Sequence, residues 1–289
     1  MRKYLLGCLL LISLLGFSQE KKDSITPVHS KWKITGLFTF LFNQSTFTNW
    51  KAGGDNTIAG NIGINYDFNY KSGKWNWDNR VITAYGLSNI QNAGVRKTSD
   101  RFEYNSLLGL KSNKNWFFSF FLNFKTQYTR GFDYKNTPRV PISDFFSPAY
   151  LSFGPGMLWK KSDDITINIA PATSRFTFVN DEFSGKYGVD PGENVKFALG
   201  FSLSAYLKFE IMENITMQNI IAMYSNYLKN AQNIDVDYQV KFSIDVNKYM
   251  TVDILFHTLI DDNASSKIQF KEIFGLGLSY VFHKKEISF

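Results

Sequence analysis

The sequence predicts an all-β protein, an antiparallel transmembrane β-barrel of about twelve strands. Three observations lead to this prediction. Apolar and polar residues alternate at a spacing of two through most of the chain, as they do in strands with one lipid-facing side. The alternating runs are long, and the links between them alternate between short and long. Aromatic residues make up 17% of the chain, and tryptophans gather at the ends of the runs.

The chain begins with the pattern of an export signal. In residues 1–18 a basic pair precedes an apolar run that small residues follow, so we expect a signal peptide that is removed. Residues 19–31 are predicted to form a polar N-terminal leader, and residues 32–289 the barrel. Removal of the signal takes away Cys8, the only cysteine, which excludes disulfides and thiolate metal sites. The net charge falls from +7 to +5, and no polybasic stripe predicts a nucleic-acid partner.

Twelve alternating runs follow the leader. They lie near 32–42, 58–70, 75–87, 102–110, 116–128, 149–159, 165–169, 197–211, 215–227, 236–246, 250–260 and 268–282. The run at 197–211 is the clearest, because an apolar residue stands at every second position. It would span about 50 Å at roughly 3.3 Å per residue, and a tilt of about 45° still leaves more than the ~25 Å apolar band of a membrane barrel. Pro171 disturbs the far half of the seventh run.

The links between the runs predict the orientation of the barrel. Tight links are expected at 71–74, 111–115, 160–164, 212–214 and 247–249, and long ones at 46–56, 88–100, 130–146 and 179–194. We therefore expect short periplasmic turns and longer extracellular loops. Five tryptophans stand beside the leader or a short turn, namely Trp32, Trp75, Trp77, Trp116 and Trp159. They are expected to form an aromatic girdle at the periplasmic interface.

Polar residues on the opposite face of the strands are expected to line the lumen. These residues are Asn65, Asp67, Asp78, Arg80, Arg101, Glu103, Lys125, Lys208, Lys241, Asp245, Asp253 and His257. Pairing of Tyr70 with Trp75 across the second turn would bring the carboxylates of Asp67 and Asp78 face to face, beside Arg80. Such a group could bind a cation or a polar ligand. We favour a mutually satisfied charge network that fills a narrow lumen.

Catalytic residues are not predicted. His257 is the only histidine on a predicted strand, and Ser243 and Asp253 could neighbour it from adjoining strands. The chain contains no G-x-S-x-G elbow, no H-E-x-x-H motif and no cluster of metal ligands. We therefore expect neither an enzyme nor a cofactor or metal site, and we interpret His257 as a polar lumen residue. An outer-membrane lipid hydrolase is the least favoured alternative.

The first long loop is the most distinctive of the long links. It contains Asn49, Trp50, Gly53, Gly54 and Asn56. The glycine pair permits backbone angles that a tight loop needs. Trp50 and the polar residues around it could bind a sugar or a peptide, or the loop could fold into the barrel mouth as a plug. We favour the plug.

Several stretches together resemble a known family. They are residues 42–56, Lys74–Asn79, Arg96–Arg101 and Ser147–Tyr150. With them the chain resembles, from about Trp32 to its end, exported Bacteroidota proteins catalogued only as a domain of unknown function (3078). The resemblance implies an outer-membrane β-barrel and brings no activity or catalytic residues.

The last run points to the same location. Gly277, Tyr280, Phe282 and the final Phe289 resemble the C-terminal signal that barrel-insertion machinery reads in outer-membrane proteins. We therefore expect an integral protein of the outer membrane that acts as a narrow channel or a conduit for small solutes. The alternative is a structural or accessory subunit of a larger outer-membrane assembly. The expected partners are outer-membrane lipid, the insertion machinery and further outer-membrane proteins.

Overall fold

The structure is a computed structural model that describes residues 31–46, 55–263 and 267–284. All of these residues belong to one compact unit. The predicted signal peptide and almost all of the leader lie outside the described residues. Within the described part of the chain, no helix combines the length and the hydrophobicity that spanning a bilayer would require.

Of the strands in the described residues, twelve form the barrel wall and two form a separate hairpin. The wall consists of β1 (Trp32–Ser45), β2 (Thr57–Ser72), β3 (Trp75–Ile90), β4 (Gly94–Asn113), β5 (Trp116–Thr126), β8 (Ala149–Lys160), β9 (Ile165–Phe178), β10 (Val195–Met212), β11 (Ile215–Asn226), β12 (Ile234–Asp245), β13 (Met250–Ile260) and β14 (Gln269–Lys284). The hairpin consists of β6 (Gly131–Asp133) and β7 (Val140–Ser143), and η2 (Asp181–Phe183) is a short 3-10 helix.

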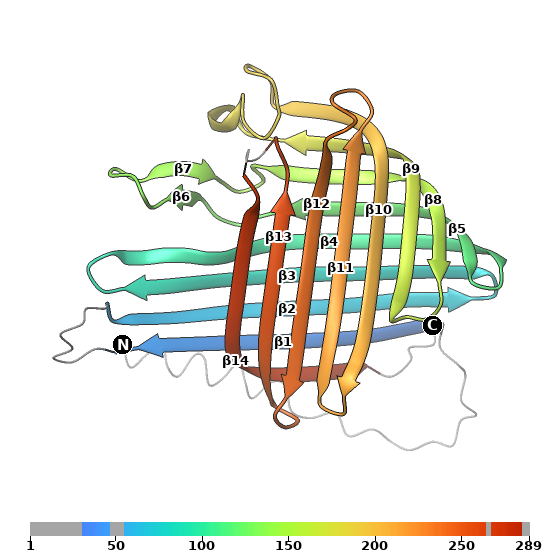
Figure 1. Cartoon of the computed structure of the whole chain (residues 1–289), viewed down its shortest axis with the longest axis horizontal. Coiled ribbons are helices and arrows are strands. Elements are labelled where there is room, and N and C mark those ends of the chain that lie inside the picture. Colours follow the sequence, from blue (N-terminus) through green and yellow to red (C-terminus); the bar gives the residue numbers. More distant parts are fainter. Residues whose placement is uncertain (1–30, 47–54, 264–266, 285–289) are drawn as a thin grey trace. The chain divides into compact units, whose positions relative to one another are not determined.

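The wall closes on itself, which confirms the predicted twelve-stranded antiparallel barrel. Each wall strand pairs with its neighbours along the chain, and β14 pairs with β1 from Ile34 opposite Lys284 to Leu41 opposite Gly277. In Figure 1 the blue to cyan strands β1–β4 cross the orange to red strands β11–β14 at a steep angle. Strands that tilt by about 40° from a barrel axis cross in this way when two opposite walls are seen through one another.

The outer face of the wall is apolar and exposed. In β5, Phe118 is 58% exposed and Phe120 is 47% exposed, whereas Ser119 between them points inward and is buried. In β14, Phe274 and Leu278 are likewise more than half exposed. The period-two alternation therefore separates an apolar outer face from a polar inner face, as predicted.

The five tight turns lie where they are expected, and they define the turn end of the barrel. The turn from β2 to β3 holds only Gly73 and Lys74, and Gly73 has φ of +56°, a backbone conformation that suits glycine. Tryptophans gather at this end: the rings of Trp32 and Trp77 are 5.9 Å apart, and Trp116 pairs with Trp159 across β5 and β8.

The loop end, opposite the turn end, differs from the prediction at 88–100. No long loop exists there, because β3 continues to Ile90 and β4 begins at Gly94. β4 has twenty residues, or about 66 Å at ~3.3 Å per residue, so it extends past any apolar band of ~25 Å. The part of a strand outside such a band needs no apolar face. A register shift opposite Gly86 and Leu87 also breaks the alternation.

The long link at 130–146 contains the β6–β7 hairpin, which is fastened to its neighbours. Arg139 donates to the backbone oxygens of Ala93 and Val95 at 2.9 and 3.3 Å. The link at 179–194 has a small core of its own, formed by Val179, Phe183 and Val189. These contacts hold two of the predicted loops in defined conformations.

Pro171 sits in a β-bulge. Against β10, Ala170 pairs with Ser202 and Thr173 pairs with Gly200, so β9 has one extra residue at this point. A bulge leaves a residue without ladder bonds and therefore suits proline, which has no N–H. The extra residue shifts the inward positions of β9 from even to odd numbers. Two glycines of β8, Gly154 and Gly156, face the bulge across the strand pair.

Gly156→Ala should destabilise the barrel. A Cβ at this position would lie 2.4 Å from the backbone oxygen of Ile169, so the backbone would have to move. We expect a loss of about 1–3 kcal/mol in the free energy of unfolding, measured by urea titration of the detergent-folded protein. Gly63→Ala is the control, because its nearest atom would lie at 4.0 Å. Equal unfolding midpoints for the two variants would contradict the close approach.

Candidate functional site

The inner face near the turn end carries two ion pairs. Arg80 Nε lies 2.5 Å from Asp67 Oδ1, and its guanidinium lies 5.1 Å from the ring centroid of Tyr206 on β10. Lys160 Nζ lies 2.7 Å from Asp78 Oδ2. Each carboxylate thus has its own cationic partner, which offsets part of the cost of removing both charges from water.

The predicted pairing across the turn between β2 and β3 is wrong by two residues. Tyr70 pairs with Trp77 instead of Trp75, so Asp67 lies opposite Arg80 instead of Asp78. The cause is the two-residue turn, which is shorter than the link assumed from the sequence. The two carboxylates therefore do not meet face to face as expected.

A second group of polar side chains surrounds Glu103 on β4. Glu103 is only 5% exposed. Its Oε2 accepts from Arg101 Nε at 3.0 Å, and its Oε1 accepts from Asn105 Nδ2 at 2.8 Å. Asn123 on β5 donates to both Glu103 and Asn105. The buried carboxylate thus has hydrogen bonds on both oxygens, as a buried charge requires.

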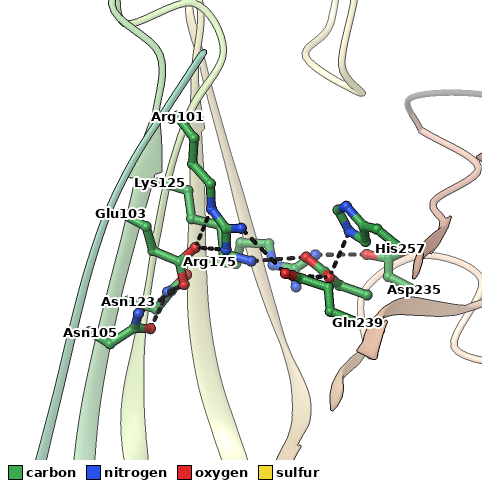
Figure 2. Close-up of polar contacts among 10 residues, drawn as sticks. Arg101, Glu103, Asn105, Asn123, Lys125, Arg175, Asp235, Gln239 and His257 are labelled. Carbon is green, nitrogen blue, oxygen red and sulfur yellow. Dashed lines mark hydrogen bonds and ion pairs between the residues drawn. The ribbon is translucent and has the colours of Figure 1, made fainter. Parts of the chain in front are cut away.

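This group reaches across the lumen to β12. Lys125 Nζ lies 3.1 Å from Asp237 Oδ2, and Arg101 Nη1 lies 3.4 Å from Gln239 Oε1. β4 and β12 are six places apart in the ring of twelve strands, so they stand on opposite walls. Figure 2 shows Arg101, Glu103 and Lys125 reaching toward Gln239 and His257 from the other wall. We call Arg101, Glu103, Lys125, Asp237 and Gln239 the cross-lumen network.

His257 does not join Ser243 and Asp253 in a catalytic arrangement. His257 Nε2 lies 3.0 Å from Asp237 Oδ1, at the edge of the cross-lumen network. Ser243 instead donates to Asp253 at 2.7 Å, and Asp253 also pairs with Lys241 at 3.0 Å. Within the described part of the chain, His257 therefore has an orienting carboxylate but no bonded nucleophile, which general-base catalysis would need.

The remaining predicted site residues are less connected. The side chains of Asn65, Lys208 and Asp245 form no hydrogen bond or ion pair with another described residue. Asn56 lies just before β2, where its backbone oxygen accepts from Gln91 N at 2.8 Å. The other residues predicted for the ligand or plug loop, namely Asn49, Trp50, Gly53 and Gly54, lie outside the described residues.

Sequence reasoning missed several inner-face residues. Asp237 and Gln239 alternate with Val236, Tyr238 and Val240, so the same period-two signal would have found them. Arg175, which pairs with Asp235 at 2.7 Å, was harder to predict. The bulge at Pro171 precedes Arg175 in β9 and shifts the inward positions from even to odd numbers.

Comparison with protein families gives one match. Residues 42–132 match the model of a family described as "Protein of unknown function (DUF3078)". The resemblance noted from the sequence is thereby confirmed over that part of the chain, whereas an origin in Bacteroidota stays a prediction. No curated protein matches the chain.

Several solved structures are similar to this barrel. They include an outer-membrane channel from Pseudomonas putida F1, 8% identical, with a TM-score of 0.41 over 93% of this chain and 100% of that one. The translocator domain of the autotransporter NalP from Neisseria meningitidis is 7% identical, with a TM-score of 0.39 over 96% and 95%. The outer-membrane channel DcaP of Acinetobacter baumannii is 8% identical, with a TM-score of 0.35 over 87% and 96%. Identities and scores this low give no indication of function.

Arg80→Ala should destabilise the barrel. The substitution leaves Asp67 without its partner, and we expect a loss of about 1–2 kcal/mol, because both side chains keep some contact with water. Urea unfolding of the detergent-folded protein measures the effect. The double variant Arg80→Ala with Asp67→Asn should recover part of the loss, because no unpaired charge then remains. An unfolding midpoint that Arg80→Ala leaves unchanged would count against a structural role for this pair.

Proposed function

We propose that the protein is an integral outer-membrane β-barrel that acts as a narrow conduit for small polar solutes, without catalytic activity. The observation that carries the proposal is the arrangement of one wall: an apolar, exposed outer face encloses an inner face with both signs of charge. Hydrocarbon outside the barrel would account for the apolar outer face, and water inside it would account for the charged inner face.

The outer face supports a membrane location. Exposed aromatic and aliphatic side chains follow strands on every part of the wall, for example Phe42, Ile62, Phe120, Phe197 and Phe274. Soluble proteins rarely expose apolar surface on this scale. Among spanning structures, closed barrels are typical of outer membranes, where they insert with the help of insertion machinery after export. Export through residues 1–18 and burial in outer-membrane lipid belong to the same proposal.

The cross-lumen network supports a narrow conduit. Every described strand other than β6 and β7 belongs to the wall. The contacts that cross the lumen at the level of the network are therefore made by side chains. Long, flexible side chains such as Arg101 and Lys125 can change rotamer without breaking the wall. The network contains cations and carboxylates together, so we propose weak selectivity between anions and cations instead of a ring of one charge.

A structural or accessory role in a larger assembly is the second candidate. The direct contacts of Lys125 with Asp237 and of Arg101 with Gln239 favour it, because they tie opposite walls together and fill the lumen at rest. An outer-membrane lipid hydrolase has less support, since Ser243 and His257 bond to different carboxylates.

The membrane location predicts a depth-dependent cost for charge on the outer face. Phe120→Arg, near the middle of β5, should cost about 2–4 kcal/mol of folding free energy in lipid vesicles. Trp75→Arg, beside the turn between β2 and β3, removes an aromatic ring of similar exposure. Beyond the free energy lost with the ring, the charge at this position should cost only about 0–1 kcal/mol. An equal cost of the charge at the two positions, measured for each arginine variant against the alanine variant of the same residue, would contradict the location. A wild-type protein that stays in the aqueous phase without detergent would contradict it too.

Lys125→Ala should increase single-channel conductance. The substitution removes the ion pair with Asp237 across the lumen. The shorter side chain should leave the lumen wider at this level. Currents through the purified barrel in a planar bilayer measure the change. Lys208→Ala is the matched control, because it removes the same charge from the inner face outside the cross-lumen network. Folded wild-type and Lys125→Ala barrels that are both silent would favour the structural role instead.

A further inference from the structure

A cavity lies at the loop end of the barrel, and none of the residues of the cross-lumen network line it. It is bounded by β8–β12 and by the links that follow β9, β11 and β13, and its volume is about 60 Å³. Three tyrosines line it, namely Tyr150, Tyr187 and Tyr224, together with a group of three aspartates. A polar space of this size can hold an ion with a few waters.

The aspartates are Asp235 at the start of β12, and Asp261 and Asp262 after β13. One carboxylate oxygen from each lies within 4.8 Å of the others. Calcium binds oxygens at about 2.4 Å, so two ligands on opposite sides of one ion are about 4.8 Å apart. A single ion of this size could therefore contact all three carboxylates.

Only one of the three carboxylates, that of Asp235, has an ion pair with a described residue. Asp235 pairs with Arg175 at 2.7 Å. Asp261 accepts from the backbone N–H of Asn263 at 2.9 Å, and neither Asp261 nor Asp262 forms an ion pair with a described residue. Two lysines also line the cavity: Lys196 donates to the Asn263 side chain at 3.2 Å, and Lys229 lies on the link after β11.

Tyr224 provides an independent indication of a ligand. Its side chain lines the cavity, lies opposite Asp235 in the β11–β12 pairing, and is only 3% exposed. Its hydroxyl has no hydrogen-bond partner within the described residues. The guanidinium of Arg175 stacks on its ring at 3.5 Å from the centroid. A buried hydroxyl of this kind is costly unless something in the cavity bonds to it.

We propose that the cavity binds a divalent cation of the calcium type. Asp261 and Asp262 supply carboxylate oxygens, Asp235 supplies a third, and a water on the ion donates to the Tyr224 hydroxyl. All of these ligands are oxygens, which a hard cation prefers, and the described residues that line the cavity include no histidine or cysteine to favour a transition metal. The ion would link β12 to the β13–β14 connection. Binding does not require that ions cross the lumen, so it is independent of conduction.

Tyrosine-sensitised terbium luminescence tests the site in the full chain, folded in detergent. Tb³⁺ occupies calcium sites, and the three lining tyrosines can transfer energy to it. We expect saturable emission that Ca²⁺ displaces, and at least about tenfold weaker Tb³⁺ binding in Asp261→Asn and in Asp262→Asn. Asp164→Asn is the matched control, because it removes the same charge at the turn end. Emission that Ca²⁺ does not displace, or unchanged affinity in both variants, would overturn the proposal.

Tyr224→Phe distinguishes ion binding in the cavity from nonspecific binding to acidic loops. The variant keeps the ring and its stacking with Arg175, so the barrel should retain its circular dichroism and its heat-modifiable mobility in gels. We expect roughly tenfold weaker Tb³⁺ binding, because the bound water loses its partner. Wild-type affinity in this variant would overturn the part assigned to the hydroxyl and place the ion outside the cavity.

Discussion

The pairing of β1 with β14 is the constraint on which the rest of the structure depends. In the proposed membrane location, hydrocarbon would offer no hydrogen bonds, so each wall strand would need a partner on both sides, and only a closed sheet supplies this. Closure also gives every strand an inner and an outer face. Because side chains alternate along a strand, the outer face then carries Phe118 and Phe120 while Ser119 and Asn123 turn inward.

Closure brings charges from opposite walls within bonding distance. Each ion in the lumen loses part of its hydration, and this cost exceeds the attraction of a single partner unless further hydrogen bonds are made. Glu103 receives them from Arg101, Asn105 and Asn123, and Asp237 receives them from Lys125, Gln239 and His257. The two carboxylates are thus the centres of the hydrogen bonding inside the barrel, and Asp237 on β12 accepts from Lys125 on the opposite wall.

Much of the fold followed from alternation alone, whereas contacts in the lumen did not. The strands at 116–126 and 195–212 and all five tight turns were predictable, because a wall with an apolar outer face has an apolar residue at every second position. The ends of β3 and β4 were missed, since a strand end outside an apolar band has no such requirement. The bond between Lys125 and Asp237 was also beyond the sequence, because it depends on the width and stagger of the closed barrel, which alternation does not specify.

The bulge at Pro171 divides β9 into two segments with opposite phase. Asn168 and Ala170 point inward before it, and Thr173 and Arg175 point inward after it. Loss of one residue between these pairs would turn the guanidinium of Arg175 toward the outer face and an aromatic ring toward the interior. Insertions and deletions in related sequences should therefore be rare here. They should be common in the link at 179–194, because the length of a link does not decide which strand residues point inward. The number of residues around Pro171 should therefore stay constant even where the residues themselves change.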